Sequence, residues 1–188
     1  MENHSHLLML NKPKGYVVTR SDEKGRKTVY ALLPEWAYEE GWMPVGRLDL
    51  GSTGLLLFTR EGKLADRLTH PGSCHKVYEV WVRGHVTKDH VQRALKGVQT
   101  SEGLLKVVRV EIKGGAGPKT RLEVELDEGR NRHIRRLFNA LKDPKFGTPL
   151  KVLELRRTQI GPLALDVGSG KWRFLTDIEE TRLSSPAG

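Results

Sequence analysis

One stretch of the chain combines residue types that can do covalent or acid–base chemistry, PVGRLDLGSTGLLLFTREG at residues 44–62. Asp49 stands there two positions after Arg47 and just before a turn-prone Gly51-Ser52 pair, with no adjacent second acid. A single carboxylate can act as a nucleophile or carry a proton without a metal. The stretch therefore predicts a catalytic aspartate, and the alternative is an acid that caps a turn.

A second stretch, DEGRNRHIRRLFNAL at residues 127–141, combines an apolar stripe with clustered cations. The stripe has helical spacing and consists of Ile134, Leu137, Phe138 and Leu141. Because residues three and four apart share one face of a helix, we expect a helix from about Asn131 that docks on the core. A helical wheel at about 100° per residue puts Arg135 beside the stripe.

Arg130, Arg132 and Arg136 supply the other cations of this stretch. On the same wheel Arg132 and Arg136 point nearly opposite the stripe, and two like charges four positions apart cost an isolated helix about 0.2–0.5 kcal/mol. An anionic ligand reverses the sign of that cost. We therefore expect these arginines to contact phosphate groups, with a solvated charged face as the alternative.

The composition favours a polyanionic partner. The chain has 188 residues with 32 Lys and Arg against 23 Asp and Glu, a net charge of +9. Such an excess repels itself unless an anionic partner neutralises it, so nucleic acid is the first partner to consider. The single cysteine, Cys74, cannot form an internal disulfide, as expected in a reducing compartment. Because no apolar run approaches the roughly 20 residues that cross a bilayer, we expect a cytoplasmic protein without a membrane partner.

Hydrophobic periodicity predicts the elements that must position these residues. Apolar and polar side chains alternate, as in half-buried strands, at 77–83, 104–112, 121–127 and 151–160. A continuous apolar run at 54–59 predicts a strand buried on both faces. Helical spacing predicts a helix at 88–96, with Thr87 as N-cap and Gly97 near its end, and shorter helices at 28–33 and 63–68. Together these elements predict an α+β fold with a mixed, mostly antiparallel central sheet and a few helices.

We expect one domain over residues 6–182, because no repeat, low-complexity tract or long linker divides the chain. Two subdomains that share one sheet are the alternative. The ends, residues 1–5 and 183–188, are expected to be flexible.

Two further patterns are better explained by turns than by ligand sites. His70, Cys74 and His75 lie close together, but a zinc site needs three or four converging ligands and the chain has no second cluster of suitable spacing. Residues 113–120 are rich in glycine, but Pro118 interrupts the phosphate-loop pattern. We therefore expect no metal, a loop at the first pattern and a hairpin turn at the second.

With these stretches in view, the chain resembles the ribosomal RNA pseudouridine synthases, in the branch that modifies single uridines of the small or large subunit. Four motifs match in order: LNKPKGYVVTRSD (10–22), GRLD with TGLLL (46–57), KVYEV (76–80) and EGRNRHIRR (128–136). The resemblance is greatest to the short large-subunit members of type E, which lack the N-terminal accessory RNA-binding domain. It departs from the family pattern at His133, commonly a glutamine, and at Gly51-Ser52, commonly polar or acidic residues.

The resemblance implies the pseudouridine synthase catalytic fold with an active-site cleft, and isomerisation of one uridine in 23S ribosomal RNA without a cofactor. It makes Asp49 the catalytic residue, either as nucleophile or as base. Arg135 becomes the cation that keeps this carboxylate ionised in a desolvated pocket. Tyr78, on the inward face of its predicted strand, becomes the aromatic ring that stacks on the uracil.

The residues expected to bind RNA are Lys12, Arg47, Arg130, Arg132 and Arg136. By the same resemblance, Arg47 fills the space that the target uridine leaves when it is flipped out of the RNA, a step that costs a few kcal/mol. We expect ribosomal RNA to be the partner of a monomeric enzyme. The alternative is a non-catalytic rRNA-binding or ribosome-assembly protein on the same fold, and both predict RNA binding that weakens with salt.

Overall fold

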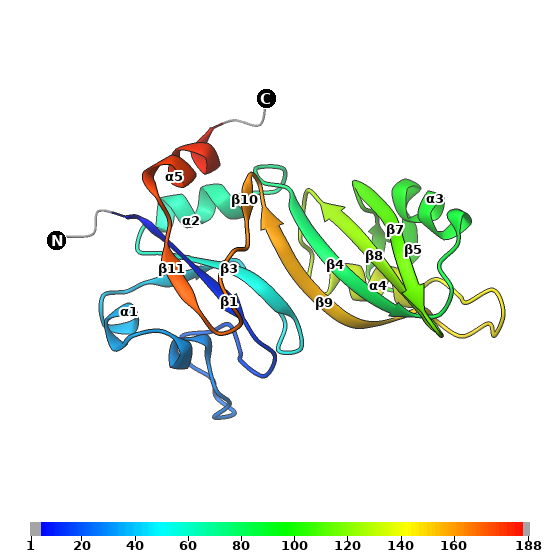
Figure 1. Ribbon diagram of the computed structural model, residues 1–188, viewed down its shortest axis with the longest axis horizontal. Helices are drawn as coiled ribbons and strands as arrows, with labels where there is room; N and C mark the ends of the chain where they lie inside the picture. Colours follow the sequence, from blue (N-terminus) through cyan, green and yellow to red (C-terminus); the bar gives the residue numbers. More distant parts are fainter. Residues whose placement is uncertain (1–4, 186–188) are drawn as a thin grey trace. The chain divides into compact units, whose positions relative to one another are not determined.

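A computed structural model of the chain describes residues 5–185, which form two compact units. The first unit contains the residues up to Cys74 and those from Arg157 onward, and the second contains His75–Arg156. Each unit has its own strands and helices, labelled in Figure 1. No helix in this described range is long and apolar enough to cross a membrane.

The sheet of the first unit is built around two strands, β1 (Leu7–Lys12) and β3 (Thr53–Thr59). They pair antiparallel from Leu7 opposite Thr59 to Lys12 opposite Gly54. β11 (Trp172–Phe174) pairs with the other edge of β1, and β2 (Met43–Val45) pairs with β3. β9 (Lys151–Ile160) enters this unit at Arg157, lies next to β3 and turns back into β10 (Leu163–Ala164).

β1 and β3 are buried at nearly every position. Since successive side chains of a strand point to opposite faces, both faces of this sheet are covered by other side chains. One apolar cluster includes side chains from α2 (Gly62–Thr69) and α5 (Asp177–Ser184). Its members include Leu7, Met9, Leu55, Leu57, Leu64, Leu68 and Leu183. Phe58 alternates with Leu57 along β3, and its ring meets Tyr30 of η1 (Val29–Leu32) edge-on, with ring centroids 5.9 Å apart. The strand predicted at 54–59 to be buried on both faces is thus confirmed.

Aromatic rings pack together at the β11 edge of the first unit. Trp36 of α1 (Glu35–Glu39) stacks on Phe174, with ring centroids 5.6 Å apart and planes at 11°. Trp42 and Trp172 also contact Phe174 with their rings, at centroid distances of 5.7 and 5.3 Å. These contacts hold the short β11 strand against the segment that precedes β2.

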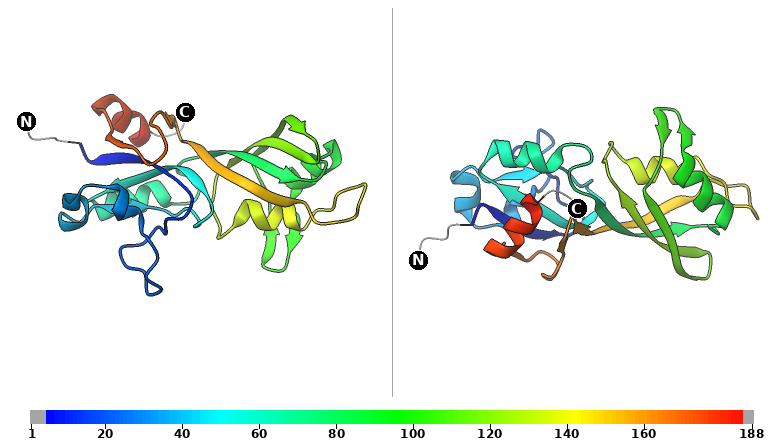
Figure 2. Two further views of the ribbon diagram at one scale, coloured as in Figure 1. Left: turned by 60° about the horizontal axis from the view of Figure 1, so that its bottom comes forward. Right: turned by 90° about the horizontal axis from the view of Figure 1, so that it is seen from above.

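The second unit is built on a three-stranded antiparallel sheet in the order β4–β8–β7, with the first part of β9 beside β4. The three strands span Lys76–Arg83 (β4), Arg109–Ala116 (β7) and Lys119–Leu126 (β8). Between β4 and β7 the chain forms α3 (Lys88–Lys96), β5 (Val98–Thr100) and β6 (Gly103–Leu105). α4 (His133–Asn139) follows β8. In both views of Figure 2, α4 and the β5–β6 hairpin lie on the same face of this sheet.

Most predicted elements are present, and the predicted α+β class with mostly antiparallel pairing is confirmed. The helix predicted at 88–96 is α3, and the Thr87 hydroxyl accepts a hydrogen bond from the His90 N–H, as its predicted N-cap role requires. The short helix predicted at 63–68 is α2. The predicted strands at 77–83, 121–127 and 151–160 are β4, β8 and β9, and the glycine-rich segment 113–120 contains the turn of the β7–β8 hairpin.

The strand predicted at 104–112 is wrong as a single element, because β6 and β7 are separate strands. Between them, Val107 donates its N–H to the carbonyl of Ala94 in α3, at 3.0 Å. Val108 donates to the carbonyl of Glu125 in β8, at 2.9 Å. Between β6 and β7, backbone N–H groups therefore donate to carbonyls of α3 and β8. The alternation of apolar residues continues through this break and could not reveal it.

Two predicted helices also differ in the structure. The helix expected at 28–33 is the 3₁₀ helix η1. The helix expected from Asn131 begins only at His133, because Arg132 has a left-handed backbone with φ of 55°. An L-residue in that conformation cannot continue a right-handed helix.

The two ends of the described range are held more firmly than expected. Ser5 is buried, and its hydroxyl donates to the carbonyl of Leu7 at 2.9 Å. At the other end, α5 continues to Ser184 and buries Leu183. The expected flexibility of residues 1–4 and 186–188 concerns positions outside the described residues.

Candidate active site

Asp49 lies in the loop between β2 and β3, in the first unit. Gly46, with φ of +76°, lets the chain turn away from β2, a conformation that glycine adopts without strain. Leu48 is buried and anchors the loop, whereas Arg47 is exposed and Asp49 is half-buried. The Ser52 N–H donates to the Asp49 carbonyl at 3.0 Å and closes a turn before β3. The predicted aspartate therefore begins a tight turn and still leaves part of its side chain accessible.

Lys12, the last residue of β1, is completely buried beneath this turn. Its ammonium nitrogen lies 3.0 Å from the carbonyl oxygen of Asp49, 3.3 Å from that of Leu50 and 2.7 Å from that of Ser52. Burial lowers the pKa of Lys12 to about 8, against the opposing effect of the Asp49 charge. The expected RNA-binding role of Lys12 does not fit this geometry, because its ammonium faces main-chain oxygens rather than solvent. Lys12 instead holds the backbone of the Asp49 turn.

A cavity of about 490 Å³ lies beside Asp49 within the first unit. Arg47 and Asp49 line it together with residues between positions 17 and 26. On that side, Arg26 and Asp22 form an ion pair at 2.9 Å, and hydrogen bonds from Arg26 lower the pKa of Asp22 to about 2. The cavity volume falls within the range of about 300–1,000 Å³ that is usual for small-molecule sites. The structure thus brings Arg47 and Asp49 together at one cavity.

Tyr78 lies in the second unit, in the middle of β4 and opposite Val124 of β8. Its side chain is buried, with 7% of the residue exposed, among the apolar positions of the strand. The prediction that Tyr78 points inward is therefore confirmed.

The arginines of the predicted phosphate-binding stretch also lie in the second unit, in three different environments. Arg130 is exposed, with its guanidinium 3.4 Å from the carboxylate of Glu128. Arg132 is exposed and occupies the N-cap position of α4. Arg135 is half-buried within the helix. Because Arg132 precedes the helix, the helical wheel does not give the direction of its side chain.

Arg136 differs most from its expected outward position. Its guanidinium forms an ion pair with Glu102 of the β5–β6 turn, and its side chain is only 27% exposed. The hairpin that supplies Glu102 is distant in sequence, so the wheel could not include it. Arg136 is therefore partly neutralised within the protein.

His133, where the family commonly has glutamine, is buried at the start of α4. Its Nε2 lies 2.8 Å from the carbonyl oxygen of Lys106, so Nε2 carries the proton in this contact. Burial lowers the pKa of His133, which favours the neutral ring. The histidine thus ties the start of α4 to the segment between β6 and β7, a contact that the motif does not reveal.

The predicted loop at the His70–His75 segment is confirmed, and Cys74 is buried within it. In residues 5–185, no group of three or more His, Cys, Asp or Glu side chains gathers in a way that could hold a metal ion.

Comparison with known proteins identifies the family. Residues 6–140 match the family model described as RNA pseudouridylate synthase. A ribosomal large subunit pseudouridine synthase B of Pseudomonas aeruginosa is 38% identical over 100% of this chain and 47% of its own length. The enzyme of the same name from Haemophilus influenzae is 44% identical over 92% of this chain and 47% of its own length. The chain thus spans about half the length of these curated relatives.

A solved structure gives the same family at the level of the fold. A crystal structure of a pseudouridylate synthase superimposes with a TM-score of 0.79 and 27% identity, covering 97% of this chain and 75% of that one. The two curated relatives carry the type B name, whereas the sequence motifs resemble type E most. The expected family is confirmed by sequence and by fold. The chain belongs to the RNA pseudouridylate synthase family.

Proposed function

We propose that this chain isomerises a uridine of large-subunit ribosomal RNA to pseudouridine, with Asp49 as the catalytic carboxylate. The observation that carries the proposal is the Asp49 turn itself. In a chain of this family, the one acid of the GRLD motif lines a cavity, and buried Lys12 holds its backbone. The names of the curated relatives support large-subunit RNA as the substrate.

The reaction breaks the C1′–N1 bond of uridine and forms a C1′–C5 bond, with no net oxidation. In one route the Asp49 carboxylate attacks C1′, and the uracil leaves with the electron pair of the broken bond. C5 of the turned base then attacks C1′ and releases the carboxylate, while C5 loses a proton and N1 gains one. In the other route the carboxylate removes a sugar proton and later returns it. Both routes require Asp49 to be ionised at the start.

The remaining roles follow from the family motifs. Arg135 stabilises the ionised form of Asp49, since a guanidinium offers a carboxylate two parallel donors. Tyr78 provides the aromatic face for the uracil. Arg47 occupies the space that the flipped uridine leaves, and Arg130, Arg132 and Arg136 contact phosphates. We further propose that the chain acts in the cytoplasm as a monomer and needs no cofactor.

An Asp49→Asn variant tests the central role. It replaces the carboxylate by an amide of nearly the same shape, so neither route can begin. On an unmodified large-subunit rRNA transcript, we expect no pseudouridine after digestion to nucleosides and chromatographic separation from uridine, and an RNA affinity within a few-fold of the wild type. Asp66→Asn is the matched control, because Asp66 is an exposed acid of α2 in the same unit.

Pseudouridine formation by Asp49→Asn at the wild-type rate would contradict the proposal. If the wild-type chain bound the RNA and formed no product, the non-catalytic RNA-binding alternative would stand instead.

A further inference from the structure

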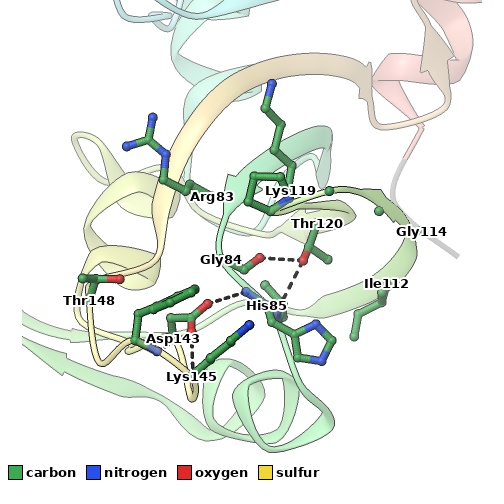
Figure 3. Close-up of a pocket in the computed structure, with 15 residues that line it drawn as sticks. Arg83, Gly84, His85, Ile112, Gly114, Lys119, Thr120, Asp143, Lys145 and Thr148 are labelled. Carbon is green, nitrogen blue, oxygen red and sulfur yellow. Dashed lines mark hydrogen bonds between the residues drawn. The ribbon is translucent and has the colours of Figure 1, made fainter.

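A second cavity, of about 760 Å³, lies entirely within the second unit and contains none of the predicted site residues. It is bordered by the end of β4, the β7–β8 hairpin and the loop from α4 to β9 (Figure 3). In that view Arg83 and Lys119 lie on the upper side of the cavity, and Asp143 and Lys145 lie on the lower side. Its volume is ample for a small organic ligand or a nucleotide.

Asp143 organises the lower side of the cavity. Its carboxylate accepts hydrogen bonds from the N–H groups of His85 at 2.8 Å, Lys145 at 2.8 Å and Phe146 at 3.0 Å. These donors lower the pKa of Asp143, so its negative charge is already balanced by main-chain dipoles. The loop that carries Lys145 and Phe146 is consequently fixed to the end of β4.

Gly84 makes this attachment sterically possible. Its φ is +110°, and a Cβ at this position would lie 2.6 Å from the Leu150 side chain and 2.9 Å from the Asp143 carboxylate. The Gly84 carbonyl accepts a hydrogen bond from the Thr120 hydroxyl at 2.7 Å, and this hydroxyl accepts one from the Val86 N–H at 3.3 Å. Hydrogen bonds within the protein therefore satisfy these polar groups, and the interactions left for a ligand come from the exposed rim.

The rim is cationic and carries an exposed aromatic ring. Arg83, His85, Lys119 and Lys145 are exposed. Phe146 is 71% exposed, with the Lys145 ammonium 5.1 Å from its ring centroid. An aromatic ring among cations is the arrangement that binds single-stranded nucleic acid, because bases stack on the ring and phosphates pair with the cations.

The hairpin side of the cavity leaves room for a flat ligand. Gly114 and Gly117 contribute no side chains there, and a Cβ at either position would meet open space. Both have positive φ, at 147° and 58°, so larger residues would be strained at these positions. This wall thus combines the main chain at Gly114 and Gly117 with the side chains of Ile112 and Pro118, and a base can lie against it.

We propose that this cavity binds a single-stranded nucleotide of the RNA substrate other than the uridine that is isomerised. Phe146 stacks on its base, and Lys145, Arg83 and Lys119 contact the flanking phosphates. Charge complementarity favours an RNA strand, because three cations line the cavity and its one acid, Asp143, is already paired. The inference rests on the proposed function for the identity of the RNA, and it adds a second contact site outside the Asp49 cavity.

Phe146→Ala tests the stacking contact, with Phe146→Trp as the variant that retains an aromatic face. The probe is the unmodified large-subunit rRNA transcript, and filter binding is measured over a series of KCl concentrations. We expect Phe146→Ala to weaken binding at least about fivefold without changing the salt slope, and Phe146→Trp to bind like the wild type. Because Phe146 is largely exposed, the thermal unfolding midpoint should stay unchanged, which separates a lost contact from a lost fold.

Lys145→Ala tests the phosphate contact, and Lys88→Ala is its matched control. Lys88 is an exposed lysine of the same unit that does not line the cavity. We expect Lys145→Ala to reduce the slope of log affinity against log salt by about 0.7, the value for one phosphate of a single strand. Lys88→Ala should leave the slope unchanged.

Wild-type affinity in both Phe146→Ala and Lys145→Ala would overturn the inference. So would binding of uridine monophosphate that is lost in Phe146→Ala while the affinity for the transcript stays unchanged, because the cavity would then be a site for a free nucleotide. The Asp49→Asn assay tests the proposed function separately, because it measures pseudouridine formation. The Phe146 and Lys145 variants are tested by their affinity for RNA.

Discussion

The ammonium group of Lys12 lies between the two ends of the Asp49 turn, 3.0 Å from the carbonyl oxygen of Asp49 and 2.7 Å from that of Ser52. Lys12 belongs to β1 and pairs in register with Gly54 of β3. The backbone of the proposed catalytic residue is therefore positioned by the strands of the first unit. A lysine that sequence motifs assign to RNA contact acts here on the protein's own main chain.

Replacing Lys12 by methionine should destabilise the chain and lower its activity. The substitution keeps the apolar stem but leaves the carbonyls of the turn without their charged donor, at a cost of about 2–4 kcal/mol in the free energy of unfolding. Urea denaturation measures this loss, and Lys63→Met, at an exposed position of α2, should change stability by less than about 0.5 kcal/mol. Equal stability of the two variants would show that the buried ammonium contributes nothing to the turn.

Gly54→Ala should be strongly destabilising. Gly54 has φ of +109°, and an added Cβ would lie 2.2 Å from the carbonyl oxygen of Arg157 and 2.7 Å from its nitrogen. Both contacts are with main chain, so the strands β3 and β9 would have to move apart, and we expect a loss of about 3–5 kcal/mol.

Gly62→Ala is the comparison for this substitution, because a Cβ there would meet open space at the first residue of α2. Alanine favours a helix over glycine by up to about 1 kcal/mol, so this variant should be as stable as the wild type or slightly more so. Similar urea midpoints for the two alanine variants would refute the close approach of β3 and β9.

The ion pair between Glu179 and Arg173 should make stability depend on pH in acid. Arg173 donates to both carboxylate oxygens of Glu179 at 2.7 Å and lowers its pKa from 4.5 to about 2. Because the folded chain binds this proton less tightly than the unfolded chain, the contribution is fully present above about pH 4.5 and is lost as pH falls toward 2.

The free energy of unfolding of the wild type should therefore exceed that of Glu179→Gln by an amount that shrinks between pH 6 and about pH 3.5. Denaturation series at several pH values measure this difference. A difference that stayed constant, or grew, as the pH fell would show that the carboxylate is not stabilised in its charged form.

Arg132 and Arg136 should contribute unequally to RNA binding. Arg132 is an exposed residue, whereas the Arg136 side chain is only 27% exposed and lies against Glu102, so a phosphate reaches it less easily. Arg132→Ala should reduce the salt slope of RNA binding by about 0.7, and Arg136→Ala should reduce it by less. Glu102→Gln removes the competing carboxylate and should strengthen binding. Equal slope changes for the two arginine variants would mean that Glu102 does not neutralise Arg136.

Local sequence signals are sufficient to predict the elements whose limits are set by their own residues. The helix at 88–96 carries its own start and stop, in Thr87 and Gly97, and the structure places α3 at the same residues. The strand β9 was likewise predicted at the correct residues, although its burial does not strictly alternate, since the buried positions are Val152, Leu155, Arg157 and Ile160. The Asp49 and Arg135 motifs could be recognised for the same reason, since each is continuous in sequence.

Features that depend on distant partners could not be predicted in this way. The burial of Lys12 is set by carbonyl groups 37 to 40 residues away. The environment of Arg136 is set by a turn of another hairpin, and the left-handed backbone of Arg132 overrides the helical spacing around it. The cavity around Asp143 and Phe146 joins three separate segments, none of which carries a pattern for it.

The contacts of Lys12 also explain why the Asp49 turn accepts Gly51 and Ser52, where the family commonly has polar or acidic residues. The lysine recognises carbonyl oxygens, which every amino acid supplies, so side-chain identity at these two positions is not constrained by it. Deleting one residue would move the following oxygen by about 3.8 Å and out of hydrogen-bonding reach. Natural variation in this turn should therefore appear as substitutions and not as insertions or deletions.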